Sequence, residues 1–158
     1  MEPEALQWST DSCPVGRAAE IIGDRWTLLV LREVFQGIRR FDQLTVRTEI
    51  PRQVLTDRLA RLTQDGLLRR EPYQDPGQRR RFEYRLTTKG LDLYPVLMAL
   101  GQWGEKYLDE GEGSAVEFVH RDCGARLGLV LRCADGHELT ESRDVGARPG
   151  PGARRRTA

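Results

Sequence analysis

The residues best suited to chemistry are basic and amide side chains on one short stretch of the chain. Arg52, Gln53 and Thr56 share a face of the segment Pro51–Asp65, and Arg58 lies on its flank. Glutamine can pair bidentately with adenine, and arginine with guanine or phosphate. Most polar helix faces are simply solvated. Evidence for recognition of a nucleic acid must therefore come from the neighbouring segments of the sequence.

A second basic cluster lies 14 residues after this segment. It follows a turn signal in which proline fixes φ and glycine supplies a positive φ. The flanking segments, Leu67–Tyr73 and Arg81–Leu86, alternate in polarity like strands. The stretch Arg69–Arg85 is therefore predicted to be a β-hairpin, whose arginines hold phosphates or enter the minor groove. These arginines are Arg79, Arg80 and Arg81.

The elements that must position these side chains are two short helices. Leu55, Leu59 and Leu62 recur at helical spacing and predict one apolar face for Pro51–Asp65. The upstream stretch FDQLTVRT predicts a second helix, and only two residues separate the two. This is the helix-turn-helix arrangement, whose second helix can enter the major groove. With the hairpin beside it, the pattern predicts a winged helix-turn-helix.

The charge distribution supports the same interpretation. The whole chain carries a net charge of only +1, but residues 32–89 hold 14 basic against 8 acidic side chains. A local basic surface is what phosphate binding requires, because neutralised phosphates release their counterions. Arg40 lies just before the first helix of the motif. We expect its segment to pair with the hairpin and to present the arginine to a phosphate.

Upstream, Cys13 is predicted to be the N-cap of a helix that begins at Pro14. A thiol at that position is subject to the positive end of the helix dipole, which favours the thiolate. Cys13 is therefore a candidate sensor of oxidants or electrophiles, and the alternative is a small capping residue with no signalling role. Asp24 is predicted to cap the next helix, with Trp26 in the core.

After the hairpin, Thr87 or Thr88 is predicted to cap a long helix. Pro95 is expected to kink this helix near its first turns or to displace its start. Its apolar face is wider than packing within one small domain requires. We interpret that face as a homodimer interface formed with the N-terminal helix, and the alternative is ordinary intramolecular core. A dimer would place two recognition helices about one DNA turn apart.

The last part of the chain raises the question of a metal. Four side chains form two pairs with ligand-like spacing, so a structural zinc is a candidate cofactor. The alternative is a small hairpin whose Cys and His are packing residues or the remains of a lost site. The four are His120, Cys123, Cys133 and His137.

Four segments are predicted: a flexible N-terminal segment (1–12), a winged helix-turn-helix domain (13–111), an extension resembling a degenerate zinc ribbon (112–145) and a disordered tail (146–158). The fold class is thus mainly α with a small β-hairpin wing, dimerisation helices and a short C-terminal extension. No apolar run approaches 18 residues and no signal peptide is evident, so we expect a cytoplasmic, nucleoid-associated protein without membrane contact.

An enzyme is not expected, because the two histidines lie beyond the predicted domain and no phosphate loop or H-E-x-x-H motif is present. The motifs CPVGRAAEIIGDRW, RRFDQL, VLTDRLARLTQDGLL, RFEYRLTTKG and QWG occur in that order. They resemble the HxlR-type winged helix-turn-helix transcriptional regulators, relatives of the MarR group, over Cys13 to Leu108. The resemblance implies a bacterial homodimer that represses or activates genes by binding double-stranded operator DNA.

Some members of that family sense electrophiles through a cysteine at the position of Cys13. The chain departs from the family at Pro51, where a serine hydroxyl usually opens the recognition helix. The alternative function is a winged-helix adaptor for proteins with a zinc-stabilised tail.

Overall fold

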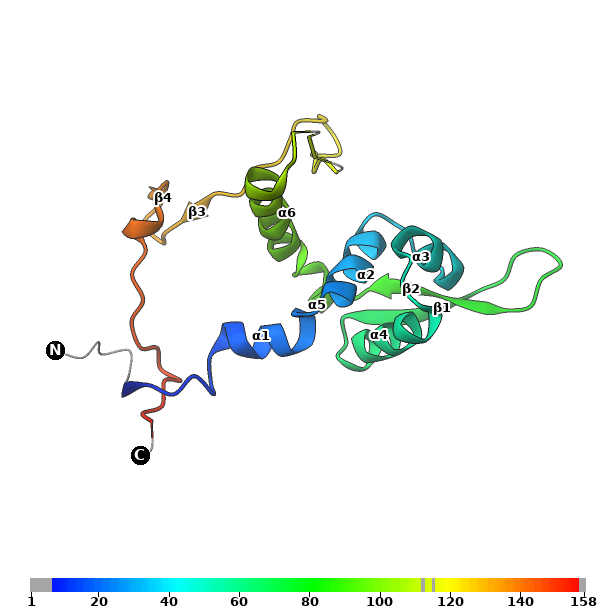
Figure 1. Cartoon of the computed structure of the whole chain (residues 1–158), viewed down its shortest axis with the longest axis horizontal. Coiled ribbons are helices and arrows are strands. Elements are labelled where there is room, and N and C mark those ends of the chain that lie inside the picture. The colour runs from blue at the N-terminus through cyan, green and yellow to red at the C-terminus, as the bar shows by residue number, and fades with distance from the viewer. Residues whose placement is uncertain (1–6, 112, 115, 157–158) are drawn as a thin grey trace. The chain divides into compact units, whose positions relative to one another are not determined.

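The computed structural model describes residues 7–111, 113–114 and 116–156, and the chain divides into two compact units (Figure 1). The larger unit covers residues 21–116, and the smaller unit combines the segments on either side of it. The larger unit contains α2 (Arg25–Phe35), α3 (Phe41–Thr48), α4 (Arg52–Gln64), β1 (Leu68–Tyr73), β2 (Arg81–Leu86), α5 (Thr88–Leu91) and α6 (Tyr94–Leu108). The smaller unit contains most of α1 (Pro14–Ile22), with β3 (Leu131–Arg132), β4 (Glu138–Leu139) and the 3₁₀ helix η2 (Ser142–Asp144).

Helix α2 begins where its cap predicts. The Asp24 carboxylate accepts hydrogen bonds from the backbone N–H groups of Trp26 and Thr27, both at 3.1 Å. These bonds satisfy donors that the first turn of a helix leaves without partners. Arg58 Nε of α4 lies 3.3 Å from the same carboxylate. Asp24 thus ties the start of α2 to α4, and the predicted N-cap is confirmed.

Asp24→Ala is expected to lower the free energy of unfolding by about 1 kcal/mol near neutral pH. Partial burial raises the pKa of Asp24, but the hydrogen bonds from Thr27 and Trp26 and the charge of Arg58 outweigh it and lower the pKa below 3.8. Stability from a carboxylate with a lowered folded-state pKa is present above its unfolded pKa and is lost as the pH falls through the folded value. Urea unfolding at a series of pH values should show the two proteins converging below about pH 4. A pH-independent difference would contradict this origin.

The hydrophobic core lies between α2, α3, α4 and the base of the hairpin. The leucine stripe of α4 is buried as predicted, and Leu55 and Leu59 are fully buried. Trp26 is half-buried and packs against this core, as predicted. The buried apolar side chains of the cluster are Val30, Leu31, Val34, Leu44, Ile50, Leu55, Leu59, Leu62, Leu67 and Leu68.

Among the described residues of this unit, one charged side chain is buried in the interior. Glu33 of α2 is fully buried and pairs with Arg32 and, at 3.1 Å, with Arg47 of α3. A buried carboxylate is tolerated when cations neutralise it. The Glu33–Arg47 pair therefore links α2 to α3.

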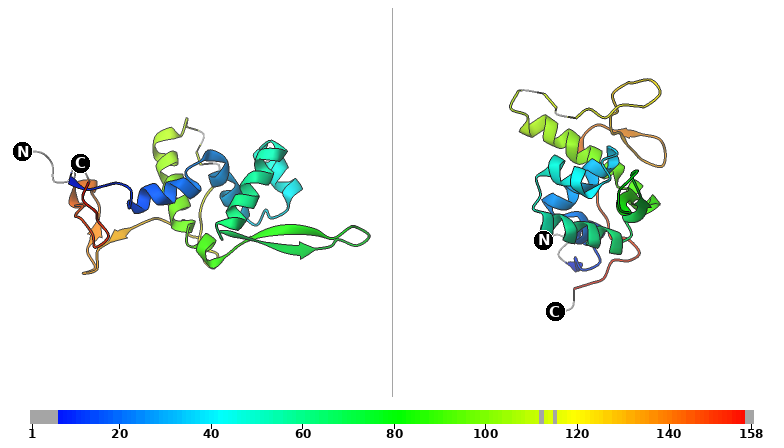
Figure 2. Two further views of the ribbon diagram at one scale, coloured as in Figure 1. Left: turned by 90° about the horizontal axis from the view of Figure 1, so that it is seen from below. Right: turned by 90° about the vertical axis from the view of Figure 1, so that its right-hand side faces the viewer.

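The strands β1 and β2 form the predicted antiparallel hairpin, with Leu68 opposite Leu86 and Tyr73 opposite Arg81. At its tip, Gln78 N–H donates to Asp75 O at 3.0 Å and Gly77 adopts φ +74°, as the Pro-Gly turn predicts. The hairpin extends away from α2, α3 and α4 in Figures 1 and 2. It is the wing of a winged helix-turn-helix.

The long helix predicted after the hairpin is interrupted. Thr87 caps the short helix α5 by accepting a hydrogen bond from Gly90 N–H at 3.1 Å, and α6 starts only at Tyr94. The physical reason is Pro95, which lacks an N–H group and lies in the first turn of α6. This confirms the predicted displacement of the start of the helix.

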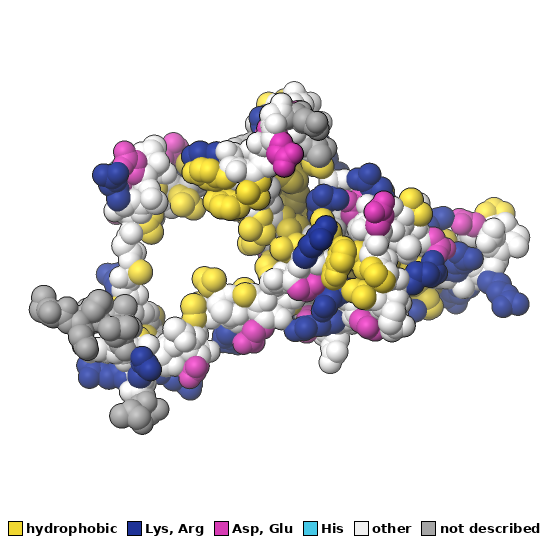
Figure 3. Space-filling model, viewed as in Figure 1, with side chains coloured by type: hydrophobic (Ala, Val, Ile, Leu, Met, Phe, Trp, Pro, Cys, Tyr) yellow, Lys and Arg dark blue, Asp and Glu magenta, His cyan; other side chains and the backbone are white. Residues whose placement is uncertain are grey.

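Helix α6 carries apolar side chains on an exposed face, visible in Figure 3. Leu93, just before α6, and Leu97 pack against the core. The exposed residues are Val96, Leu100, Trp103, Tyr107 and Leu108, which are 42–67% exposed.

The smaller unit contains no buried residue among its described residues. Ser9 N–H donates to Arg154 O at 2.8 Å, and Arg156 N–H donates to Gln7 O at 2.9 Å. Residues 154–156 of the tail thus pair with residues 7–9 through the backbone. The disorder predicted for residues 146–158 from their Gly, Pro and Arg content stays a prediction.

Candidate nucleic-acid interface

The recognition helix α4 presents the predicted polar residues on its exposed face. Arg52, Gln53 and Thr56 are all exposed. Gln53 Nε2 donates to Asp57 Oδ1 at 3.0 Å, and Thr56 Oγ1 donates to Arg52 O at 2.9 Å. Because the leucines on the opposite face hold α4 on the core, this polar face remains open to a ligand.

Two other residues at α4 are placed differently from this exposed row. Arg58 is half-buried and faces Asp24, so it serves the packing of α4 on α2. Pro51 is the N-cap of α4 and supplies no side-chain hydrogen bond. No side-chain hydroxyl is therefore available at this position, and Arg52 is the first residue of the helix.

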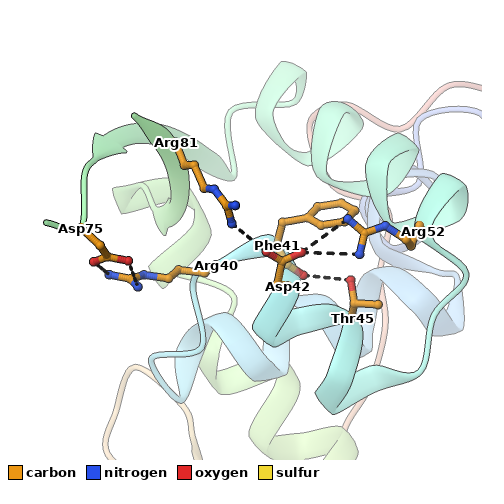
Figure 4. Close-up of polar contacts among 7 residues, drawn as sticks. All are labelled: Arg40, Phe41, Asp42, Thr45, Arg52, Asp75 and Arg81. Carbon is orange, nitrogen blue, oxygen red and sulfur yellow. Dashed lines mark hydrogen bonds and ion pairs between the residues drawn. The ribbon is translucent and has the colours of Figure 1, made fainter. Parts of the chain in front are cut away.

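Arg40 joins the start of α3 to the wing (Figure 4). Its guanidinium donates two hydrogen bonds to Asp75 at the hairpin tip, at 2.9 and 3.1 Å, and lies 4.0 Å from the centre of the Tyr73 ring. The backbone pairs as well, because Tyr84 N–H donates to Arg39 O at 2.8 Å. The predicted pairing of this segment with the hairpin is confirmed.

The wing arginines differ in their surroundings. Arg81 Nη1 donates to Asp42 Oδ2 at 3.0 Å. Arg79 and Arg80 are exposed and form no ion pair with the residues that the structure describes. They are therefore the side chains most available to phosphates at the wing.

Sequence reasoning did not identify the acidic residues of this surface. Asp42 contacts Arg52 at 3.4 Å as well as Arg81, and Figure 4 shows it between the two. Asp42 stands 10 residues from one partner and 39 from the other. No local spacing in the sequence predicts such contacts.

The other candidate residues lie in the smaller unit. Cys13 is a half-buried free thiol, and the helix α1 begins at Pro14 as predicted. His120 Nδ1 lies 3.3 Å from Cys123 Sγ, and Cys133 Sγ lies 3.5 Å from His137 Nδ1. Within the described residues, no three His, Cys, Asp or Glu side chains come together to hold a metal ion. The zinc site therefore stays a prediction.

A recognition helix, a basic wing and a core that holds them side by side define a winged helix-turn-helix DNA-binding regulator. The chain belongs to the HxlR-like helix-turn-helix family, whose sequence profile matches residues 21–112. This family consists of transcriptional regulators, and no catalytic family is indicated.

Relatives and solved structures agree with this assignment. An uncharacterized HTH-type transcriptional regulator of Mycobacterium tuberculosis is 44% identical over 144 residues, covering 91% of this chain and 90% of the relative. The crystal structure of PA1607, a proposed transcription factor, is 35% identical with a TM-score of 0.78 and covers 89% of this chain and 96% of its own. The redox regulator HypR in its reduced form is 30% identical with a TM-score of 0.54, covering 61% and 94%. None of the helices described here has the length and hydrophobicity needed to cross a membrane.

Proposed function

We propose that the protein is a cytoplasmic homodimer that binds operator DNA with α4 in the major groove and the β1–β2 wing on the backbone or in the minor groove. The observation that carries this proposal is the exposed row Arg52, Gln53 and Thr56 beside the arginines of the wing. Glutamine and arginine supply readout of base edges, and the wing arginines supply phosphate contacts.

The homodimer is supported by the exposed apolar face of α6, which water would otherwise cover. Contiguous exposed apolar side chains such as those of α6 mark interaction surfaces. A two-fold dimer would use the same face of both copies and set the two α4 helices about 34 Å apart, as a palindromic operator requires. Analytical ultracentrifugation of the full chain should give twice the mass of one 18.0 kDa chain. A monomer at micromolar concentration would contradict this part of the proposal.

Selection of bound fragments from genomic DNA tests the DNA-binding proposal. The purified protein should enrich fragments that share a palindromic sequence with half-sites about one helical turn apart. Enrichment without any shared sequence would indicate only non-specific binding. In that case the proposed base contacts of α4 would be wrong.

The double substitution Arg79→Ala and Arg80→Ala is expected to weaken operator binding and to make it less sensitive to salt. Each lost phosphate contact should reduce the steepness of the negative slope of log K against log salt by about 0.9, so the loss of two contacts should reduce it by about 1.8. Binding to an unrelated duplex should weaken to a similar extent, because phosphates carry no sequence information. Fluorescence anisotropy at several salt concentrations measures both effects, and an unchanged slope would remove these arginines from the interface.

We also propose that oxidation or alkylation of Cys13 changes operator binding. The support is a free, half-buried thiol at the start of α1 together with the likeness to HypR, a redox regulator. Diamide treatment should alter the operator affinity of the wild-type protein. The Cys13→Ser protein should not respond, whereas Cys123→Ser with Cys133→Ser should respond as the wild type does. An equal response in all three proteins would exclude Cys13 as the sensor.

A further inference from the structure

We propose that Asp42 is a specificity-determining residue, which positions Arg52 of the recognition helix and Arg81 of the wing relative to one another. This inference rests on the proposed DNA-binding surface. The observation behind it is that one carboxylate is shared by two arginines from different elements (Figure 4).

The two oxygens of Asp42 serve different elements. Oδ2 accepts a hydrogen bond from Arg81 Nη1 at 3.0 Å, at the first residue of β2. Oδ1 lies 3.4 Å from Arg52 Nη2, at the first residue of α4. Asp42 itself lies in the first turn of α3, where the helix dipole favours a carboxylate. A single side chain thus connects all three elements that meet at the proposed DNA surface.

Arg52 is also held from a second side, because its guanidinium lies 4.8 Å from the centre of the Phe41 ring. The carboxylate of Asp42 and this ring together restrict the direction of the Arg52 side chain. Arg81 starts from a fixed point of the hairpin, where it is the cross-strand partner of Tyr73. A guanidinium restrained in this way loses less rotamer freedom when it binds DNA, which lowers the cost of binding.

The wing does not depend on Asp42 for its attachment. Arg40 holds the hairpin tip through Asp75, and Arg39 pairs with Tyr84 through the backbone. Substitution of Asp42 should therefore leave the fold and the wing in place. Its effect should be confined to the directions of Arg52 and Arg81.

A carboxylate on a phosphate-binding surface also has a cost. Asp42 is 59% exposed and repels DNA of any sequence. Its removal should therefore strengthen non-specific binding, while it releases two arginines from the geometry that suits the operator. The loss of charge should raise the affinity for every duplex, whereas the loss of positioning should lower the affinity for the operator alone. The ratio of the two affinities therefore distinguishes positioning from a simple change of charge.

The test compares Asp42→Asn with the wild type on the selected operator and on a scrambled duplex of the same length. The matched control is Glu49→Gln, which removes one negative charge between α3 and α4 from a side chain without an ion pair among the described residues. For Asp42→Asn we expect the ratio of operator to scrambled affinity to fall about three- to tenfold, since each of the two exposed ion pairs contributes at most about fivefold. For Glu49→Gln we expect both affinities to rise alike and the ratio to stay within about twofold.

A ratio that is unchanged in Asp42→Asn, with a wild-type protein that prefers its operator, would overturn this inference and leave the proposed function intact. A wild-type protein without any preference between the two duplexes would overturn the proposed function itself. Equal melting temperatures of the variants and the wild type confirm that the comparison concerns binding. As a second measurement, Asp42→Asn in an Arg52→Ala and Arg81→Ala background should change the ratio no further. A further fall of the same size would show that Asp42 does not act through these arginines.

Discussion

Leu59→Ala is expected to lower the free energy of unfolding by about 2–5 kcal/mol, since it removes a fully buried side chain and leaves a cavity. Leu59 lies on the buried face of α4, opposite the proposed DNA-facing residues. The loss should therefore appear in urea denaturation and should reduce the population of folded, DNA-binding protein. Val46→Ala is the control, because Val46 is 79% exposed on α3 and its truncation should change stability by at most about 0.5 kcal/mol.

A similar loss of stability in both variants would contradict the core described for the larger unit. If Leu59→Ala lowers the free energy of unfolding only slightly, neighbouring side chains must move into the cavity. In that case the helix would be free to shift on the core, and the exposed row of α4 would not have a fixed position.

Gly90→Ala is expected to destabilise the protein by at least about 1–3 kcal/mol, the usual cost of overpacking. A Cβ atom at Gly90 would clash with the backbone carbonyl oxygen of Leu67 and would lie 2.9 Å from Leu86 Cδ2. The carbonyl belongs to the main chain just before β1, so it cannot turn away as a flexible side chain would. The result should be a lower melting temperature and a displaced wing.

The same substitution at Gly16 provides a matched comparison. A Cβ atom there would lie 3.8 Å from Cys13 Cβ, which is an ordinary contact. Alanine is the better helix former by about 1 kcal/mol, so Gly16→Ala should leave stability unchanged or raise it. Opposite signs at the two positions are expected in thermal unfolding. A neutral Gly90→Ala would contradict the close approach of α5 to the start of the hairpin.

The helix and hairpin elements could be predicted because their signals are local. The leucine spacing of α4, the Asp24 cap of α2 and the Pro-Gly turn of the wing each involve residues within a few positions of one another. The role of Gly90 illustrates the limit of such signals. Glycine ends the motif RFEYRLTTKG, but only the fold brings it against a carbonyl 23 residues upstream.

The ion pairs of the proposed DNA surface could not be predicted, because they depend on how separate elements pack. Arg58, which was predicted to flank the DNA-facing row, pairs with Asp24, the N-cap of α2. The sequence did not single out Asp42 and indicated Asp75 only as part of the hairpin turn, although each pairs with an arginine of the surface. Counting basic residues in the sequence therefore overestimates how many of them are free of ion pairs within the protein and available to DNA.

The most direct test of the account is a base-pair scan of the selected operator with the wild-type protein and with Gln53→Ala. Each single base-pair change within the contacted half-site should cost the wild type about 1–3 kcal/mol. At the one position that Gln53 reads, Gln53→Ala should bind the original and the changed operator equally well, while it keeps the wild-type preference elsewhere. A Gln53→Ala protein that discriminates like the wild type at every position would contradict the placement of α4 in the major groove.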